Sequence, residues 1–479
     1  MKFFNKFILI LVLFLTFPTL TNAFLYLPYA RIRIVKQIIG GKDDTFEFRH
    51  YRLPSIVTLD KFEITTQNGN GSMDYGIIFV PGPDLIYETY SPNWDIVSIV
   101  CSSTNPLNKF EYKETGVALE LQDQSDSTCI FTNKAKSLKN PVLIIPGVLG
   151  TELFKNEEEL WANPKMAIPE NSDDFMDPLA FKKELLPTDT LVKTKEIIKK
   201  RPLFDYSNGL INDFTSQGYT EGTTSEATLF TFPYDWRFGV NRGNSVALKL
   251  KIDSILAQTG ASKVDVVAHS TGGLLVKRYV SEYPDSHNIG KAVFVGVPNT
   301  GAPKAVKVLL QGDNFGVTGL SDEEMKKISQ NMPVVYDLLP SVRYYNNKGS
   351  YYKLIEKNST GYGYTEKDLN FTETNNELKN RLSLNSQAID NSSELHNLNF
   401  DNLDLRVSNI DLYNIAGCKN MDTIGKIVAT KITSESGSPI NFESKTTPGD
   451  GTVPLESATN LPVDSEKKFY ALKDRKSVV

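Results

Sequence analysis

One strand–turn–helix segment constrains the fold of this chain more than any other. The apolar run Val264–Val267 predicts a buried parallel strand, and Leu274–Val280 predicts the first turns of a helix. Ser270 lies between them, with the small residues Ala268 and Gly272 two positions before and after it. Small residues at both positions let the backbone pass close to itself in a sharp turn. Such a segment is typical of a nucleophile elbow, so we predict that Ser270 is a nucleophile; an ordinary loop serine is the alternative.

The N-terminus has the pattern of a secretory signal peptide. Lys2 and Lys6 precede the apolar run Phe7–Leu15, and Thr21-Asn22-Ala23 supplies small residues at the cleavage positions. This order predicts a signal peptide at residues 1–23. An uncleaved membrane anchor is the alternative, but the apolar run is shorter than the ~20 residues that a span needs. We therefore expect a secreted protein or one at the extracytoplasmic cell surface.

Length, charge and cysteine content narrow the class of protein. The 479 residues suffice for two or three domains with a large core. A net charge of −5 gives no reason to expect a nucleic-acid partner. Cys101 and Cys129 share one segment and are disulfide candidates in an oxidising compartment, which leaves Cys418 as a small buried residue. The cysteine spacing matches no zinc pattern, and we expect no metal.

Residues 24–137 have the pattern of an all-β domain. Short alternating segments at 45–48, 62–66 and 95–100 are separated by clusters of turn residues. The run that ends at Trp94, the following Cys101 and the ending CIFTN from Cys129 resemble the prealbumin-like (SpaA-type) β-sandwich repeats of bacterial surface proteins. In those repeats the two corresponding cysteines pair, so the resemblance implies a Cys101–Cys129 disulfide.

The pattern changes to α/β from Pro141. The apolar runs Val142–Ile145, Ala292–Val297 and Leu412–Ala416 predict further buried parallel strands. The Asn-, Ser- and Thr-rich stretch 350–405 carries no strand signal, and we interpret it as cap material. The predicted fold class is α/β: an α/β-hydrolase with cap or lid insertions over residues 138–479, preceded by a small all-β sandwich.

Two further parts of a serine site are visible. The loop Pro146–Gly150 follows the first α/β strand, and the backbone N–H groups of Val148 and Thr271 are predicted to form an oxyanion hole. Asp450 lies late in the chain in the sequence GDGTVP, as the triad order serine, acid, histidine requires. Taken alone, an aspartate between glycines is also a common turn residue.

The second domain resembles the family of lecithin:cholesterol acyltransferase and lysosomal phospholipase A2. The matching motifs, in family order, are PVLIIPGVLGTEL from Pro141, Trp161, FPYDWR from Phe232, AHSTGG from Ala268, GVPNTGAP from Gly296 and GDGTVPLES from Gly449. The resemblance implies Ser270 as nucleophile, Asp450 as triad acid, and Val148 and Thr271 as oxyanion donors. It places Trp161 in a lid or membrane-facing element, with a core aromatic as the alternative. It also implies an acyl-enzyme formed from a phospholipid, passed to water or a lipid alcohol, without cofactor or calcium.

The histidine base of the family is missing. No histidine follows Asp450, and of the four histidines in the chain only His396 has a conceivable path to the nucleophile. Without a base, acylation falls by about 10⁴-fold or more, so we expect these 479 residues to be nearly inactive. The last six residues, Asp474–Val479, are the translation of GATCGGAAGAGCGTCGTG, a common sequencing adapter. We therefore expect the natural sequence to diverge near Lys473 and to continue to a histidine, which sequencing of the gene from genomic DNA would test.

The predicted function is that of a lipid O-acyltransferase or phospholipase-type acyl hydrolase. Its partner is expected to be a phospholipid or another lipid ester at a membrane or lipid surface. A carboxylesterase or triacylglycerol lipase is the second enzymatic reading. A non-catalytic lipid-binding surface protein is the alternative from another class, but a pure binder has no need of a nucleophile elbow.

Overall fold

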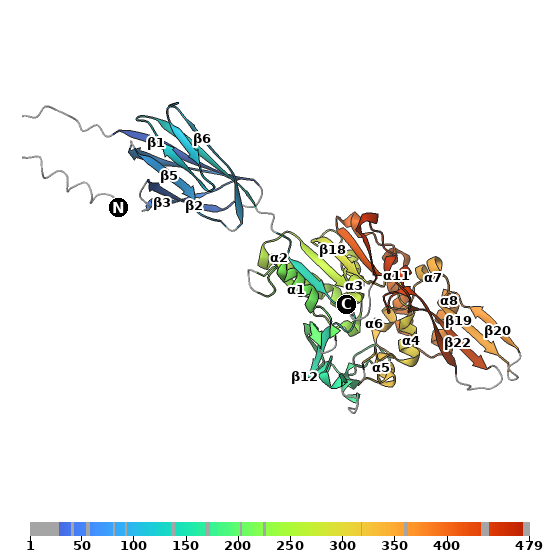
Figure 1. The fold of residues 1–479 in the computed structure, drawn as a ribbon. Helices are drawn as coiled ribbons and strands as arrows, with labels where there is room; N and C mark the ends of the chain where they lie inside the picture. Colours follow the sequence, from blue (N-terminus) through green and yellow to red (C-terminus); the bar gives the residue numbers. More distant parts are fainter. Residues whose placement is uncertain are drawn as a thin grey trace, which may run out of the picture. The chain divides into compact units, whose positions relative to one another are not determined.

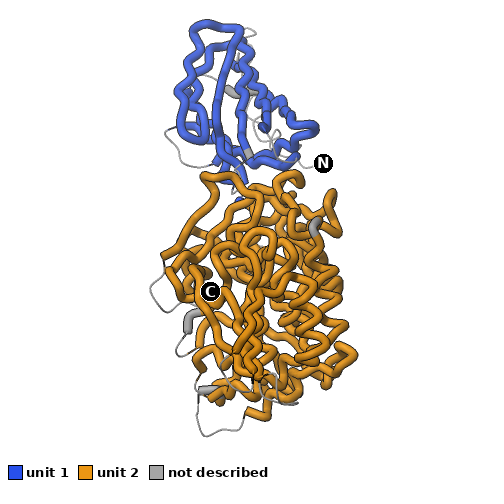
Figure 2. Tube along the Cα trace, turned by 90° about the vertical axis from the view of Figure 1, so that its right-hand side faces the viewer, with its two compact units in different colours: residues 1–139 blue, residues 140–479 orange. Residues whose placement is uncertain are grey.

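The computed structural model describes residues 28–472, apart from 40–42, 54–57, 80–81, 92, 136–138, 168–172, 202–203, 224–226, 318, 359–362 and 433–439. The predicted signal peptide and residues 474–479 lie outside the described residues. The chain divides into unit 1, residues 1–139, and unit 2, residues 140–479 (Figure 2). Each is described by itself.

Unit 1 consists of two β-sheets (Figure 1). One has the order β4–β1–β9–β6 and contains β1 (Tyr29–Ile39), β4 (Asn70–Phe79), β6 (Trp94–Ser103) and β9 (Asp126–Ala135). The other has the order β3–β2–β5–β8–β7 and contains β2 (Thr45–Arg52), β3 (Thr58–Thr65), β5 (Pro83–Glu88), β7 (Lys109–Tyr112) and β8 (Gly116–Glu120). Alternation along the strands sends apolar side chains into one core, which includes Phe48, Trp94 and Phe131.

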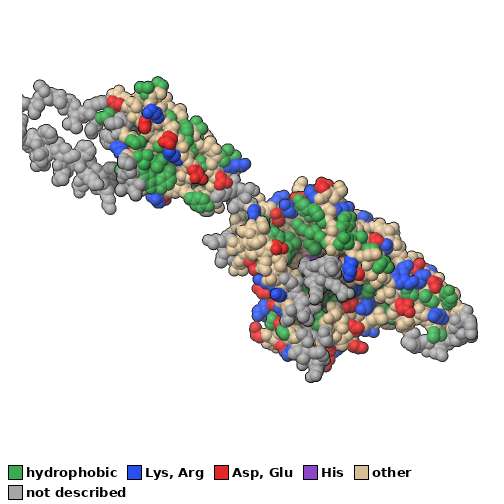
Figure 3. All heavy atoms as spheres, in the orientation of Figure 1, with side chains coloured by type: hydrophobic (Ala, Val, Ile, Leu, Met, Phe, Trp, Pro, Cys, Tyr) green, Lys and Arg blue, Asp and Glu red, His purple; other side chains and the backbone are tan. Residues whose placement is uncertain are grey.

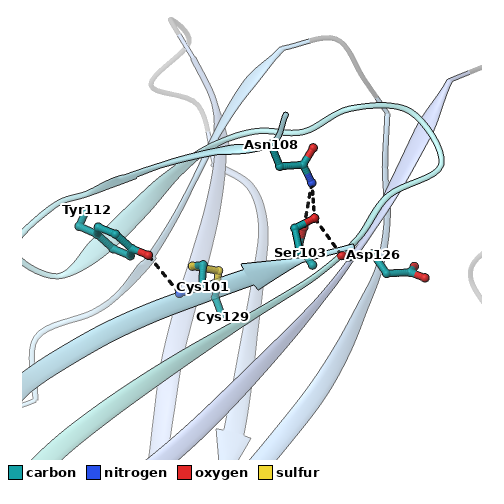
Figure 4. Close-up of a disulfide and its surroundings, with 7 residues drawn as sticks. Cys101, Ser103, Asn108, Tyr112, Asp126 and Cys129 are labelled. Carbon is teal, nitrogen blue, oxygen red and sulfur yellow. Dashed lines mark hydrogen bonds between the residues drawn. A yellow bond between two sulfur atoms is a disulfide. The ribbon is translucent and has the colours of Figure 1, made fainter. Parts of the chain in front are cut away.

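A disulfide joins Cys101 of β6 to Cys129 of β9 (Figure 4). The two residues lie directly opposite each other in the antiparallel β6–β9 pair. Cys129 is fully buried, and the backbone N–H of Cys101 donates to the Tyr112 hydroxyl at 3.2 Å. The bridge therefore ties the edge strand β6 to its neighbour from the core side.

Replacing Cys101 and Cys129 together by serine is expected to destabilise unit 1 by about 3.5 kcal/mol, because the bridge closes a loop with a sequence separation of 28. Hydrogen exchange of the β6 and β9 amides in the full chain measures this locally. Cys418→Ser is the control, since Cys418 is a free cysteine and its loss leaves those amides protected. Unchanged protection in the double variant would show that the bridge contributes nothing.

Unit 2 is built on a six-stranded sheet of order β16–β10–β17–β18–β21–β24, in which every neighbouring pair is parallel. Its strands are β10 (Val142–Ile145), β16 (Leu229–Thr231), β17 (Val264–His269), β18 (Ile289–Val295), β21 (Asp411–Gly417) and β24 (Lys468–Ala471). After β10 the chain adds β16 on one side of β10, and it later adds β17 on the other side of β10. The order of the strands therefore reverses between β10 and β17, the place where open α/β sheets bind ligands.

Helices of varied length connect and surround these strands. They are α1 (Asn208–Ser216), α2 (Arg242–Thr259), α3 (Thr271–Glu282), α4 (Lys304–Gln311), α5 (Asp322–Ser329), α6 (Pro333–Asp337), α7 (Val342–Lys348), α8 (Phe371–Asn376), α9 (Ser386–Leu395), α10 (Leu398–Asp401) and α11 (Leu455–Thr459). Short 3-10 turns are η1 (Pro164–Ala167), η2 (Asp174–Leu179), η3 (Trp236–Phe238), η5 (Leu405–Ser408) and η6 (Ser465–Lys467), and η4 (Glu377–Arg381) is a π-helical turn. Helices α2 and α3 pack against each other and against β17. In the described part of the chain, no helix is long and apolar enough to cross a membrane.

The described part of unit 2 also contains three smaller β-sheets beside the central one. They contain β11 (Thr151–Lys155), β12 (Glu158–Trp161) and β13 (Lys193–Ile197); β14 (Lys200–Arg201) and β15 (Phe204–Asp205); and β19 (Tyr352–Lys357), β20 (Tyr364–Asp368), β22 (Lys419–Ile432) and β23 (Asn441–Gly449). The prediction that residues 350–405 contain no strand is wrong, because β19 and β20 form a hairpin that joins β22. Every residue of β20 is exposed, so the strand lacks the apolar alternation by which strands are recognised.

On the face drawn in Figure 3, acidic and basic side chains of unit 2 are interspersed.

Candidate active site

Ser270 occupies the sharp turn between β17 and α3. Its φ of 51° and ψ of −125° lie where non-glycine residues are rarely found, and surrounding structure has to hold such a conformation. Two hydrogen bonds do so: the Ser270 N–H donates to the carbonyl of Val295 at 2.9 Å, and the Gly273 N–H donates to the carbonyl of Ser270 at 3.0 Å. The serine is therefore fixed at the carboxyl edge of the sheet.

The small residues around Ser270 are required by close packing. A Cβ added at Gly272 would lie 2.6 Å from the carbonyl oxygen of Pro146, and one added at Gly273 would lie 2.3 Å from a methyl group of Val297. The start of α3 thus presses against both neighbouring strand ends. This contact explains why a glycine follows the serine at the second position.

The predicted oxyanion loop lies beside the elbow, because β10 and β17 are adjacent parallel strands with Ile145 paired to Ala268. The Val148 N–H donates to Thr271 Oγ1 at 3.2 Å, so the two predicted oxyanion donors belong to residues in direct contact. The Thr271 N–H is in the first turn of α3, where amides lack intrahelical partners and carry the positive end of the helix dipole. This arrangement suits an anionic oxygen.

Two aromatic residues position the oxyanion loop. The Trp161 indole N–H donates to the carbonyl of Leu149 at 2.7 Å, and the Tyr234 hydroxyl donates to the carbonyl of Pro146 at 3.1 Å. Trp161 is only 4 % exposed and packs edge-on against Trp236. Its surroundings are those of a core aromatic that holds the loop. Tyr234 belongs to the FPYDWR motif, and its contact with the loop cannot be seen from the motif alone.

An ion pair between Arg237 and the partly buried Asp235 stabilises the same motif. The guanidinium of Arg237 donates twice to the carboxylate of Asp235, at 2.9 and 2.7 Å, and the Trp236 indole N–H donates to the carbonyl of Thr151 at 3.0 Å. Arg237 is fully buried. The motif therefore fixes the segment after β16 against the segment after β10, on which the oxyanion loop depends.

Asp450 lies at the same edge of the sheet, over the ends of β18 and β21. A Cβ added at Gly417 would lie 2.4 Å from the Asp450 Cβ, and one added at Gly296 would lie 3.0 Å from Oδ2. Oδ1 accepts the backbone N–H groups of Thr452 and Val453 at 2.8 and 2.7 Å. In the part of the chain that the structure describes, no hydrogen bond reaches Oδ2, and burial raises the pKa of Asp450. The carboxylate is held by one oxygen and has the other available for a cationic partner.

His396 and His287 do not supply that partner. Both ring nitrogens of His396 are engaged, with the Asp401 carboxylate and with the carbonyl of Asp337, each at 2.7 Å. His287 binds the carbonyl of Ser408 and the N–H of Ile289 near the amino end of β18. His269 precedes the nucleophile, and its Nδ1 would lie 3.1 Å from a Cβ added at Gly147. His396, which the sequence left as a conceivable base, is a buried structural residue.

Comparison with known proteins shows a similarity to one family over part of unit 2. Residues 193–412 match the family model described as lecithin:cholesterol acyltransferase, which confirms the resemblance shown by the motifs. Phosphatidylcholine-sterol acyltransferase of Mus musculus is 24% identical over 223 residues, covering 39% of this chain and 50% of the relative. Phospholipase A(1) LCAT3 of Arabidopsis thaliana is 25% identical over 242 residues, covering 42% of this chain and 52% of the relative. The chain thus spans about half the length of these curated relatives. Among solved structures, the Tle4–Tli4 complex aligns with a TM-score of 0.43 and 15% identity, over 67% of this chain and 89% of the other.

Proposed function

We propose that unit 2 is a serine acyl hydrolase or acyltransferase that takes an acyl chain from a phospholipid. The observation that carries this proposal is Ser270 in a strained elbow, beside the touching residues Val148 and Thr271. The names of the relatives support phospholipid as the acyl donor. An acyl-enzyme on Ser270 is then transferred to water or to a lipid alcohol.

The chemistry follows from the positions of the groups. Ser270 Oγ attacks the ester carbonyl, its proton passes to a base, and the carbonyl electrons move to oxygen. The N–H groups of Val148 and Thr271 stabilise that oxyanion, and Val148 exchanges its present bond to Thr271 Oγ1 for one to the substrate. Asp450 Oδ2 orients the base and stabilises its protonated form. The base returns its proton to the leaving alcohol, and the ester C–O bond breaks.

We further propose how the remaining parts serve this activity. Trp161 and Tyr234 position the oxyanion loop, and the segments between β18 and β21 form the cap over the site. The chain is exported, with residues 24–137 and 138–479 as separate domains. The enzyme acts on lipid esters at a membrane or lipid surface.

A base supplied from solution makes the proposal testable on these 479 residues. His396 and His287 are both engaged elsewhere in the fold, so release of fatty acid from phosphatidylcholine in mixed micelles is expected to be slow. Imidazole that binds beside Asp450 is expected to raise the rate at least tenfold, since general-base catalysis contributes about 10²–10⁴-fold. A rate that imidazole leaves unchanged would argue against the proposed site. Faster release from triacylglycerol than from phospholipid would instead favour a lipase.

Gly147→Ala is expected to lower this imidazole-dependent rate about 100-fold or more without unfolding unit 2. The added Cβ would lie 2.7 Å from the Ser270 Cβ, so the oxyanion loop or the nucleophile has to shift. Gly243→Ala is the matched control, because its Cβ would meet no atom closer than 3.4 Å. Equal activity of the two variants would show that Gly147 does not border the reacting groups.

A different observation favours a second activity, in unit 1. Lys36 of β1, Glu88 of β5 and Asn133 of β9 meet inside the sandwich, each at most 1 % exposed. Lys36 Nζ lies 2.8 Å from Glu88 Oε2, and the Asn133 amide N–H donates to Glu88 Oε1. Asn133 Oδ1 has no hydrogen-bond partner, although it is buried. Such a costly arrangement needs a reason.

We propose that Lys36 and Asn133 form an intramolecular amide cross-link. Burial lowers the pKa of Lys36 and raises that of Glu88, which favours a neutral amine beside a carboxylic acid. Lys36 Nζ then attacks Asn133 Cγ, the Cγ–Nδ2 bond breaks, and Glu88 passes one Nζ proton to the departing nitrogen, which leaves as ammonia. Lys36 and Asn133 lie on the same face of the parallel pair β1–β9, in which Asn133 is opposite Ile38. The bond would link two neighbouring strands covalently.

A further inference from the structure

Four acidic side chains from two segments of unit 2 lie in one cluster, and three of them contact Lys327. Asp173 precedes η2, Asp174 and Asp177 belong to η2, and Glu324 belongs to α5. One carboxylate oxygen from each of Asp173, Asp174 and Glu324 lies within 4.8 Å of the others. Lys327 Nζ contacts Asp177, lies 3.1 Å from Glu324 and 3.7 Å from Asp174. Lys327 therefore faces three of these carboxylates.

Glu324 is the unusual member of this cluster. It is 4 % exposed, and its Oε1 has no hydrogen-bond partner while Oε2 accepts from Lys327. A buried carboxylate oxygen without a donor is costly, and a protein retains one where a partner is missing. Oε1 of Glu324 therefore lacks the cationic partner that Oε2 has in Lys327.

The position of Asp173 is already fixed. The backbone N–H and the hydroxyl of Ser321 both donate to Asp173 Oδ2 at 2.8 Å, and the same hydroxyl accepts the N–H of Glu324 at 3.1 Å. Ser321 is therefore hydrogen-bonded both to the Asp173 side chain and to the Glu324 backbone. The remaining carboxylate oxygens of Asp173 and Glu324 are available in a fixed relation to each other, as a preorganised ion site requires.

We propose that Asp173, Asp174 and Glu324 bind a calcium ion that joins the start of η2 to α5. All donors are oxygens, which select a hard cation. Three carboxylates from the protein favour calcium, because Mg²⁺ usually keeps several waters and is held by only one or two carboxylates. The ion is structural: it compensates buried charge between two segments and takes no part in acyl transfer.

Calcium titration of the full chain after EDTA treatment tests the site, with thermal unfolding and calorimetry as readouts. Wild type is expected to bind Ca²⁺ and to unfold several degrees higher in millimolar Ca²⁺. Asp174→Asn, at an exposed position, and Glu324→Gln are expected to lose both effects. Glu323→Gln, an exposed neighbour on α5, is the matched control and should behave as wild type. Equal shifts in all variants, or none in wild type, would overturn the proposal.

A variant of Lys327 distinguishes the proposed calcium site from a simple buried ion pair between Lys327 and the carboxylates. In the proposed site its ammonium competes with the metal, so Lys327→Gln is expected to bind Ca²⁺ about tenfold more tightly. Calcium is then expected to restore the unfolding temperature that the variant loses. If Lys327 is the only counter-ion of the cluster, calcium will not rescue Lys327→Gln, and that result would contradict the proposal.

Discussion

Ser270→Ala is expected to remove all imidazole-dependent release of fatty acid from phosphatidylcholine, leaving only the rate of imidazole in solution. Loss of the nucleophile closes the acyl-enzyme route, and in a serine hydrolase with a complete triad it lowers kcat by about 10⁶-fold. Covalent labelling by a fluorophosphonate is expected to disappear with it. Ser270 is held in a strained conformation at the turn between β17 and α3, beside the residues of the proposed oxyanion hole.

The matched control is Ser281→Ala, an exposed serine on the same helix α3, which should retain both the labelling and the rate. Asp450→Asn is expected to lower the imidazole-dependent rate at least tenfold, because an amide neither orients imidazole correctly nor stabilises imidazolium. Its fluorophosphonate labelling should slow in parallel. Imidazole-dependent hydrolysis that survives in Ser270→Ala would assign the nucleophile to another residue.

The elbow could be predicted from sequence because its chemistry is local. A strand, a turn and a helix within one short segment leave few conformations for Ser270, and small flanking residues are visible without a structure. The contact between Val148 and Thr271 was also predictable, since parallel strands that flank the reversal of strand order bring the two residues together. The oxyanion role of this pair and the acid role of Asp450 stay predictions.

Features that depend on long-range packing could not be predicted. Trp161 reads equally well as a lid residue or a core residue, and only its bond to Leu149 shows which loop it supports. The β19–β20 hairpin escaped notice because exposed strands carry no apolar alternation. Lys36, Glu88 and Asn133 are far apart in sequence, and each alone resembles a surface residue. Their meeting depends on the pairing of β1 with β9 and on the packing of one sheet upon the other.

The amide cross-link of unit 1 has a second large expected effect, on mass and on stability. Tryptic digestion of the full chain is expected to yield one branched peptide that contains Lys36 and Asn133. Its mass should equal that of the two linear peptides less one molecule of ammonia. Lys36→Met and Glu88→Gln should each give the linear peptide that contains Asn133, the first because no amine remains and the second because no carboxyl group transfers the proton. Lys109→Ala, at an exposed lysine of the same unit, should leave the branched peptide unchanged.

The stability of unit 1 should follow the bond. A covalent link between β1 and β9 closes a loop of about 100 residues, and by loop entropy it stabilises the folded unit by about 4–5 kcal/mol. Amides of β1 and β9 should therefore exchange far more slowly in the cross-linked chain than in Glu88→Gln, whose side chain keeps the size of the original. Lys36→Met also removes the bond, and its uncharged side chain fits beside Phe46 and Phe131. Comparing it with Glu88→Gln separates the effect of the lost bond from the effect of the changed buried charge. If both variants match wild type in mass and in exchange, the cluster is a buried ion pair and the proposed reaction does not occur.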